Sequence, residues 1–177
     1  SDAARKTLLD AKAELKGGGT ASDDTTAALQ KALKQSRKDQ PHPAILSSLA
    51  LAHLSRGEVQ AAIPHMRRAI KFAPTAPGIA GMMHRLAEEE SKAGDDAAAQ
   101  RLLEQSIAVQ PSSSLAVEAY HRLGLLHQGG RLMATTATSS AAAAADAFGA
   151  AVRLSAVAGT SARPDTLVLW SLALSRQ

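Results

Sequence analysis

The sequence contains no cysteine, very few aromatic residues and no long apolar run, and each absence excludes a class of protein. Without cysteine there can be no disulfide framework, no thiolate metal site and no cysteine nucleophile. No apolar stretch approaches the roughly 20 residues that a membrane-spanning helix needs, so we expect no membrane insertion. Aromatic residues make up 2% of the chain, which is too few for a β-sandwich core or for a surface that stacks nucleic-acid bases.

Long runs of one charge are also missing. The 177 residues include 20 Lys and Arg against 16 Asp and Glu, a formal charge of +4, and these are spread along the chain. A dedicated nucleic-acid-binding protein usually carries a concentrated basic stripe. The mild basic excess therefore permits contact with RNA or with an acidic protein but does not indicate either.

Between Gly and Pro breakers, apolar residues recur at intervals of three and four positions, which is the pattern of amphipathic helices. The pattern predicts an all-α protein of about nine helices with no sheet. The expected helices are residues 3–16, 23–38, 43–55, 58–73, 79–93, 95–109, 114–128, 140–157 and 164–176. Residues 131–140 are expected to form a mobile loop. Pro64 is expected to kink or shorten the helix that contains it.

Three segments of the chain repeat the same spacing within each of their two helices, and the third has extra residues between the helices. The first copy carries Leu46, Leu49, Ala50 and His53 on one helix, then Ala62, Met66 and Ala69 before Pro74. The second carries Met83, Leu86, Ala87 and Glu90, then Ala99, Leu103 and Ser106 before Pro111. The third carries Tyr120, Leu123, Gly124 and His127, then Ala144, Phe148 and Ala151. Small residues fall where two helices must approach closely, and large ones fall where a gap must be filled.

This spacing resembles the tetratricopeptide repeat, a helix hairpin with Leu and Gly on its first helix and Ala, an aromatic residue, Ala and Pro on its second. The resemblance implies a right-handed α-solenoid of stacked antiparallel helix hairpins. Repeats are expected at about 43–74, 80–111 and 117–157, with a terminal helix at 164–176. Residues 1–41 fit a degenerate N-terminal helix pair stacked on the repeats of 42–177, all within a single continuous domain.

In tetratricopeptide proteins, one flank of each first helix lines a concave groove. The resemblance implies a partner-binding groove lined by Ser47, Leu51, His84, Arg85, Glu88, Glu118, His121 and Arg122. The recurrence of His-Arg at 84–85 and 121–122 favours an extended, partly acidic peptide, or else it reflects only the similarity of the repeats. Members of the family that grip a chaperone carboxylate use Lys and Asn where this chain has Ser47 and Leu51, so that mode of binding is not expected.

The six histidines of the chain are not clustered in the sequence. His53 and His127 replace the Tyr of the repeat, so we expect them to be half-buried with one ring nitrogen satisfied. His42 and His65 are expected in a loop and on the surface. No pair shows the spacing of four residues, with a nearby acid, that a zinc site on one helix would need.

Acidic residues do not form a catalytic pair either. Glu88, Glu89 and Glu90 are neighbours on one helix and point about 100° apart, so they cannot face one another. Glu90 replaces the Tyr of its repeat at an inward position, where it would need a partner. We therefore predict no enzyme activity, no metal, no cofactor and no small-molecule substrate.

These observations favour a non-enzymatic protein-protein interaction scaffold or adaptor, a subunit of a larger assembly, which binds a protein subunit or an extended peptide. The alternative is an RNA-associated helical repeat protein of a ribonucleoprotein or organellar complex. Trp170 is expected to be exposed on the terminal helix as an end-face contact. Arg67, Arg68 and Lys71 are either solvated charges or a docking patch for RNA or an acidic subunit. We expect an intracellular location, in the cytoplasm or an organelle matrix.

Overall fold

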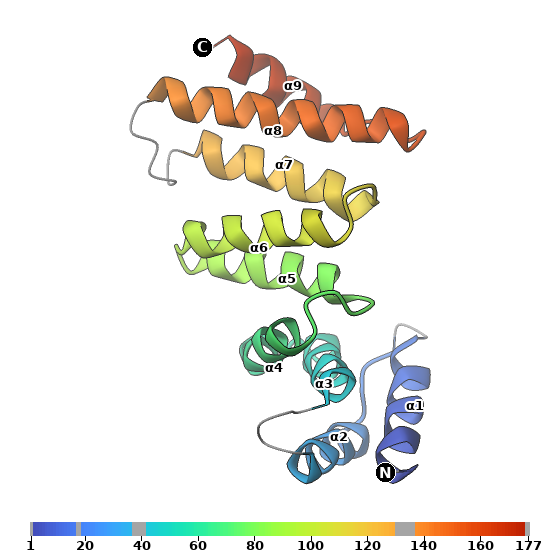
Figure 1. The fold of residues 1–177 in the computed structure, drawn as a ribbon. Helices are drawn as coiled ribbons and strands as arrows, with labels where there is room; N and C mark the ends of the chain where they lie inside the picture. Colours follow the sequence, from blue (N-terminus) through green and yellow to red (C-terminus); the bar gives the residue numbers. More distant parts are fainter. Residues whose placement is uncertain (1, 17–18, 37–41, 130–136, 176–177) are drawn as a thin grey trace. The chain divides into compact units, whose positions relative to one another are not determined.

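A computed structural model of the chain describes residues 2–16, 19–36, 42–129 and 137–175. Within these ranges it has nine α-helices and no β-strand, as the sequence predicts (Figure 1). The helices are α1 (Asp2–Lys16), α2 (Asp23–Gln35), α3 (Pro43–Ser55), α4 (Val59–Phe72), α5 (Ile79–Lys92), α6 (Asp96–Val109), α7 (Ser114–Gln128), α8 (Ala137–Val157) and α9 (Pro164–Leu174). Their ends differ from the predicted ends by at most a few residues.

Helix α8 begins earlier than expected. Its first turn starts at Ala137, inside the stretch that was predicted to be a mobile loop, so that prediction is wrong for residues 137–140. The five alanines at 141–145 explain the difference, because alanine has the highest helix propensity and favours extension of the helix into the preceding residues. Residues 131–136 lie outside the part of the chain that the structure describes.

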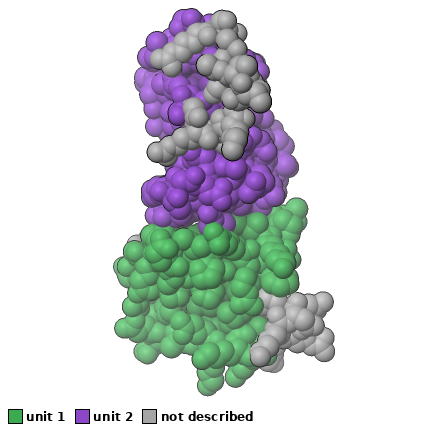
Figure 2. All heavy atoms as spheres, turned by 90° about the vertical axis from the view of Figure 1, so that its left-hand side faces the viewer, with its two compact units in different colours: residues 1–79 green, residues 80–177 purple. Residues whose placement is uncertain are grey.

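The chain divides into two compact units, residues 1–79 and 80–177, which are coloured separately in Figure 2. Unit 1 contains α1 to α4, and unit 2 contains α5, from Ala80 onward, to α9. The division follows the long connection between α4 and α5, in which Gly78 has a φ of +83°. The predicted organisation of 1–41 and 42–177 within a single continuous domain stays a prediction.

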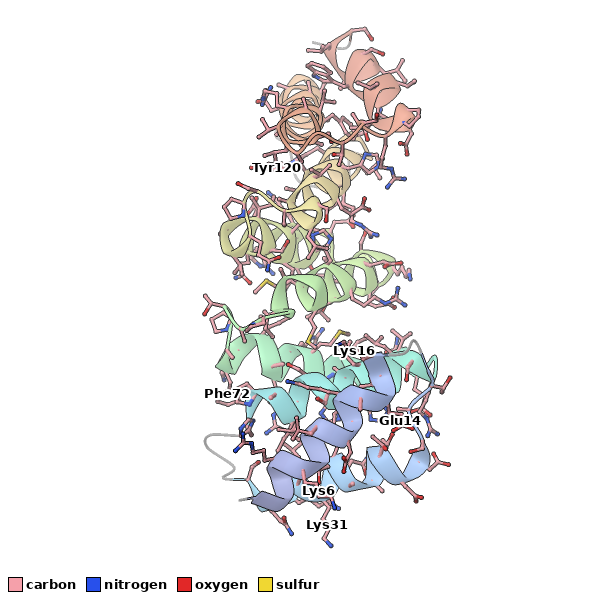
Figure 3. All side chains as sticks on the ribbon, turned by 90° about the vertical axis from the view of Figure 1, so that its right-hand side faces the viewer. Lys6, Glu14, Lys16, Lys31, Phe72 and Tyr120 are labelled. Carbon is pink, nitrogen blue, oxygen red and sulfur yellow. The ribbon has the colours of Figure 1, made fainter. Side chains whose placement is uncertain are left out.

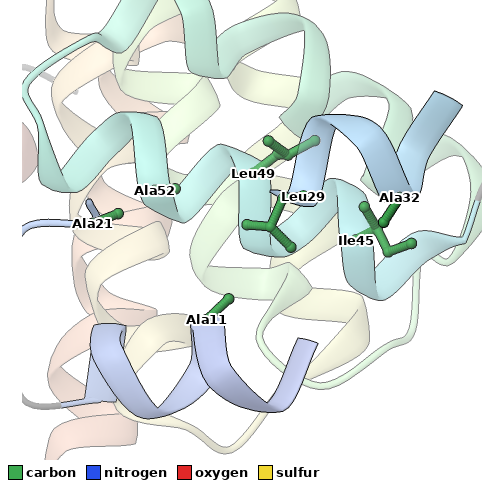
Figure 4. Packing of buried hydrophobic residues seen from close by; sticks show 7 residues of the cluster. All are labelled: Ala11, Ala21, Leu29, Ala32, Ile45, Leu49 and Ala52. Atoms are coloured by element: carbon green, nitrogen blue, oxygen red, sulfur yellow. The ribbon is translucent and has the colours of Figure 1, made fainter. Parts of the chain in front are cut away.

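Unit 1 is assembled around α3, which packs against α1, α2 and α4. A buried cluster joins Ala11 of α1 and Leu29 of α2 to Ile45 and Leu49 of α3 (Figure 4). Ala11 and Leu29 belong to the apolar stripes of the amphipathic helices α1 and α2, whereas α3 is apolar on most of its sides. Each stripe would be exposed on an isolated helix, so α1 and α2 bury their apolar faces by packing with α3 in the same unit.

The hairpin of α3 and α4 has the interior that the repeat predicts. Leu46 and Ala50 of α3, and Ala62 and Met66 of α4, are all completely buried. Between the two helices Gly57 has a φ of +75°, the left-handed conformation that commonly ends a helix and that glycine adopts without strain. The alternation of small and large residues therefore lies at the contact between the helices.

Pro64 does not shorten α4, which continues from Val59 to Phe72. Of the two predicted effects, the shortening of the helix is therefore wrong, and the kink stays a prediction. A proline at this position removes the N–H that would bond to the carbonyl group of Gln60. Both residues are exposed, so water can satisfy that carbonyl group, and the proline lies on the solvent side of a continuous helix.

Unit 2 continues the pattern of paired helices. Gly94, with a φ of +87°, separates α5 from α6, and the Asp95 side chain caps α6 by accepting a hydrogen bond from the Ala98 N–H. Helix α7 packs against both α6 and α8, and α9 packs against α8. The buried cluster that joins α5, α6, α7 and α8 consists of Ala87, Ala99, Leu103, Ala119, Leu123 and Ala147. Because most of these side chains are small, the helices can lie close together.

Helices α7 and α8 meet at Gly124. A Cβ atom at this position would lie 2.5 Å from Cε1 of Phe148, whose ring is completely buried. These two residues occupy the small position of the first helix and the aromatic position of the second helix in the third repeat copy. The ring fills the space that the missing side chain leaves.

Candidate functional site

The residues predicted to line a groove are divided between the two units. Ser47 and Leu51 lie on α3 of unit 1, where Ser47 is half-buried and Leu51 is exposed. The other six belong to unit 2: His84, Arg85 and Glu88 on α5, and Glu118, His121 and Arg122 on α7. The groove as a single surface across both units stays a prediction, and the site that can be built from contacts lies in unit 2.

On α5 the charged residues pair with one another. Nη1 of Arg85 lies 3.2 Å from Oε2 of Glu88. Nζ of Lys92 lies 3.0 Å from Oε1 of Glu88 and 2.9 Å from Oε1 of Glu89. These pairs follow from spacings of three and four residues, which place the side chains next to each other on a helix. The hydrogen bond from Lys92 holds the pKa of the Glu88 carboxyl group below its usual value.

The pairing continues from α5 to α7 and to the start of α9. Nη1 of Arg122 lies 3.9 Å from Oε2 of Glu88, and Nε of Arg122 lies 3.0 Å from Oε1 of Glu118. Glu118 also accepts a hydrogen bond of 3.0 Å from Arg163, which in turn pairs with Asp165. We call this set of residues the charged face of unit 2: Arg85, Glu88, Glu89, Lys92, Glu118, Arg122, Arg163 and Asp165.

The charged face has as many acidic as basic members. Arg85 and Arg122 are the two arginines that were predicted to bind a partner. Arg85 is already paired with Glu88, and Arg122 is paired with both Glu88 and Glu118. An acidic ligand would have to compete with these carboxylates, and exposed ion pairs exchange partners at little net gain in free energy. The arrangement therefore does not favour a purely acidic ligand, and the partly acidic peptide that the His-Arg recurrence suggested stays a prediction.

His84 and His121 do not lie on the surface of this face. Their exposed fractions are 7% and 3%, so the prediction that both rings contact a partner does not fit the structure. Nδ1 of His121 lies 2.8 Å from Oγ1 of Thr166 on α9, and its ring lies 5.7 Å from that of Phe148. Burial is the main cause that lowers the pKa of both histidines. The nearby guanidinium group of Arg122 lowers the pKa of His84 further, and that of Arg163 lowers the pKa of His121 further.

A pocket of about 130 Å³ opens beside the charged face, between α5, α6 and α7. Its apolar lining comes from Ala87, Ala99, Leu103, Leu125 and Leu126, and its polar lining comes from Glu88, Ser91 and Arg122. Two of these, Glu88 and Arg122, were predicted from the sequence. The apolar residues were missed, because in the sequence they are indistinguishable from ordinary core positions.

Trp170 is half-buried and not exposed as predicted. It packs against the cluster of Ala144, Ala145 and Phe148 on α8, and its Nε1 would lie 3.2 Å from a Cβ atom added to Gly149. The ring thus fills space over a glycine of the neighbouring helix. The exposed apolar side chains of α9 are instead Leu167, Val168, Leu172 and Leu174.

A pair of histidines in unit 1 was not predicted from the sequence. His65 was expected on the surface, but it is half-buried, and its ring is stacked on that of His53, with centroids 5.6 Å apart. Nδ1 of His53 lies 2.7 Å from Oε2 of Glu58, so the predicted satisfaction of one ring nitrogen is confirmed, but the side chain is buried and not half-buried as predicted. Across the described ranges, no three His, Asp or Glu side chains come together as metal ligands.

Comparison with solved structures identifies the fold. One structure of the MamA protein matches with a TM-score of 0.64 and 22% sequence identity, covering 86% of this chain and 73% of that chain. A putative kinesin light chain of Podosopora anserina with nearly identical TPR-like repeats matches with a TM-score of 0.58 and 21% identity, covering 97% of this chain and 85% of that chain. The chain has a tetratricopeptide-like fold. No protein-family model and no curated protein sequence matches it.

The tetratricopeptide-like fold explains why the charged face is continuous. The predicted repeats make α5, α7 and α9 the first helices of successive hairpins, and in a solenoid equivalent flanks of neighbouring first helices lie next to each other. Glu88 and Arg122, the residues that connect α5 with α7, lie on such flanks.

No helix in the described ranges is both long enough and apolar enough to cross a bilayer.

Proposed function

We propose that this tetratricopeptide-like protein is a non-enzymatic interaction scaffold whose unit 2 binds an extended segment of a partner protein. The observation that carries the proposal is the pocket between α5, α6 and α7, which has an apolar lining and has Glu88 and Arg122 among its polar residues. A pocket with a mainly apolar lining and a few polar groups is the usual form of a recognition site.

The size of the pocket suggests what it holds. A volume of about 130 Å³ corresponds to roughly four water molecules in the liquid, which is enough for one aliphatic side chain but not for a folded element. Complete burial of a Leu or Ile side chain contributes about 1.5–3 kcal/mol. This is a factor of roughly 10 to 150 in the dissociation constant, so one anchor residue would dominate the affinity of a short segment.

The charges around the pocket suggest what flanks the anchor. Glu88 has cationic neighbours in Arg85, Lys92 and Arg122, and Arg122 has acidic neighbours in Glu88 and Glu118. A ligand with charges of both signs can pair with the carboxylate and with the cation of each ion pair. A ligand of one sign displaces one of these two groups and leaves it without an opposite charge. The proposed ligand is therefore an aliphatic residue flanked by an acidic and a basic residue.

A displayed library of random 12-residue peptides tests this proposal without knowledge of the natural partner. The wild-type chain should enrich a motif with a single aliphatic anchor and mixed flanking charges. Leu125→Glu places a carboxylate at the pocket and should abolish the enrichment. Leu172→Glu is the matched control, because the two leucines have nearly the same exposure, 42% and 43%, and Leu172 lies on α9, away from the pocket lining.

Two outcomes would refute the proposal. Selection could return no common motif on the wild-type chain, or the motif could survive Leu125→Glu unchanged. Loss of binding in Leu172→Glu alone would move the ligand to α9. Circular dichroism of each variant verifies that the helices are intact, and since both leucines are about half exposed, neither substitution should unfold unit 2.

We further propose that the chain is a subunit of a larger assembly and that the outer surface of α9 is its end-face contact. Support comes from four exposed aliphatic side chains on an 11-residue helix, Leu167, Val168, Leu172 and Leu174. A photo-crosslinking amino acid at position 172 should give a crosslinked product of higher mass in the native cell. The same amino acid at the exposed Gln105 of α6 should not, and absence of product at 172 would contradict the proposal.

A further inference from the structure

The net positive charge of the chain comes entirely from unit 1. Residues 1–79 contain 12 Lys and Arg against 7 Asp and Glu, a net charge of +5, whereas residues 80–177 contain 8 against 9, a net charge of −1. The net charge of +4 for the whole chain conceals this difference. A partner that recognises positive charge should therefore recognise unit 1.

Within unit 1 the outer surface of α4 contributes cations and no acids. At 3.6 residues per turn, the exposed residues of this helix fall within an arc of about 140°. We call this surface the basic face of α4, and it consists of Gln60, Ala61, Pro64, Arg67, Arg68, Lys71 and Phe72. No Asp or Glu occurs anywhere in residues 59–87, so the helix offers its own cations no ion-pair partner.

The cations of α4 differ in their ion pairing from those on the charged face of unit 2. There Arg85, Lys92 and Arg122 each pair with a carboxylate. On α4, by comparison, neither Arg68 nor Lys71 forms an ion pair with any residue in the described ranges. Like charges three positions apart on a helix repel and cost a few tenths of a kcal/mol. An acidic partner would relieve this repulsion.

Apolar groups lie among these cations. Phe72 lies at the end of α4 (Figure 3). Its side chain is 38% exposed, and Nζ of Lys71 lies 6.0 Å from the centre of its ring. Pro64 and Ala61 continue the apolar surface along the helix. A phosphate backbone gains nothing from covering such groups, whereas a peptide with apolar side chains removes them from water.

We propose that the basic face of α4 binds an acidic segment of a partner protein that also carries apolar side chains. From Ala61 to Phe72 the helix rises about 16 Å, a length that about five residues of an extended chain cover. The acidic side chains of the segment would pair with Arg68 and Lys71, and an apolar one would cover Phe72. This surface is separate from the pocket of unit 2, and the proposal does not depend on it.

The test measures binding of a fluorescein-labelled peptide, EELEEFEE, to the full chain by fluorescence anisotropy. The double variant R68E/K71E should bind the peptide at least tenfold more weakly than wild type. The matched control is R5E/K12E, which makes the same change in charge at exposed positions of α1, a helix that packs on α2 and α3. The control should weaken the binding by less than about twofold, which is the share that the change in net charge alone contributes.

Several results would overturn the proposal. Equal weakening by R68E/K71E and R5E/K12E would show a response to net charge alone. Equal binding of a peptide with Gln in place of every Glu would show that charge is not recognised. Tight binding of a 12-nucleotide uridine RNA, without binding of the peptide, would assign the surface to nucleic acid. If R68E/K71E does not fold, R68Q/K71Q takes its place. Leu125→Glu should leave this affinity unchanged, which separates failure here from failure at the pocket.

Discussion

Replacing Gly124 by alanine places a methyl group where the ring of Phe148 already lies. The added Cβ atom would lie 2.5 Å from Cε1 and 2.6 Å from both Cδ1 and Cζ of this ring. The ring cannot move into solvent because it is completely buried. Either α7 and α8 must separate or Phe148 must leave its preferred rotamer, and both responses lower the free energy of unfolding of unit 2.

Two opposing effects set the magnitude. Alanine favours a helix over glycine by about 1 kcal/mol. Overpacking of a well-filled interior usually costs about 1–3 kcal/mol, and three ring atoms in contact place this site near the upper end of that range. We therefore expect a net destabilisation of about 2 kcal/mol for Gly124→Ala, although alanine is the better helix former.

Trp170 provides the assay. It is the only tryptophan in the chain and packs on the same cluster as Phe148, so urea denaturation followed by its fluorescence reports on unit 2. Gly81→Ala is the matched control, because a Cβ atom at this helical glycine would meet nothing within 4 Å, and it should be neutral or slightly stabilising. Phe148→Leu should partly rescue Gly124→Ala in a double-mutant cycle. A Gly124→Ala chain as stable as wild type would refute the packing argument.

The remaining predictions concern buried and half-buried histidines. Burial lowers the pKa of His65, His84, His121 and His127. Because the unfolded value is about 6.5, the neutral rings stabilise the fold above that pH and this stability is lost as the pH falls below it. The urea midpoint should therefore be lower at pH 5.5 than at pH 7.5, and equal midpoints would contradict this. Thr166→Val removes the hydroxyl group 2.8 Å from Nδ1 of His121 and should cost about 1–3 kcal/mol. In the same fluorescence assay, Ser171→Ala at an exposed position should cost less than about 0.5 kcal/mol, and a similar cost for both would argue against a buried hydrogen bond.

The helices and their pairing could be predicted because their signals are local. Apolar spacing acts over one or two turns, and a glycine such as Gly57 or Gly94 ends a helix through its own backbone conformation. The contrast of small and large residues at Ala50, Ala62 and Met66 indicated which sides of the helices face each other, and all three are buried. The effect of Pro64 on the length of α4 could not be predicted, because its cost depends on whether the carbonyl group it leaves unpaired can reach water, and this depends on which side of α4 faces the solvent.

The candidate site was only partly predictable, since its interactions join residues that are distant in the sequence. Glu118 meets Arg163 across 45 positions, and His121 meets Thr166 across the same interval. The repeat pattern selected Glu88 and Arg122 as surface residues but also selected His84 and His121, which are buried. A register position defines the direction in which a side chain leaves its own helix, not what a neighbouring helix places over it.

The amino-acid sequence by itself determined that the chain is helical, where each described helix begins and ends to within a few residues, and that the helices pair in a tetratricopeptide-like pattern. All of these follow from interactions within a helix or between helices adjacent in the chain. Only the tertiary structure decided which charges neutralise one another, which histidines are buried, and that a pocket lies between α5, α6 and α7. Ion pairing, burial and cavity volume depend on the distance between separate helices, and packing alone sets that distance.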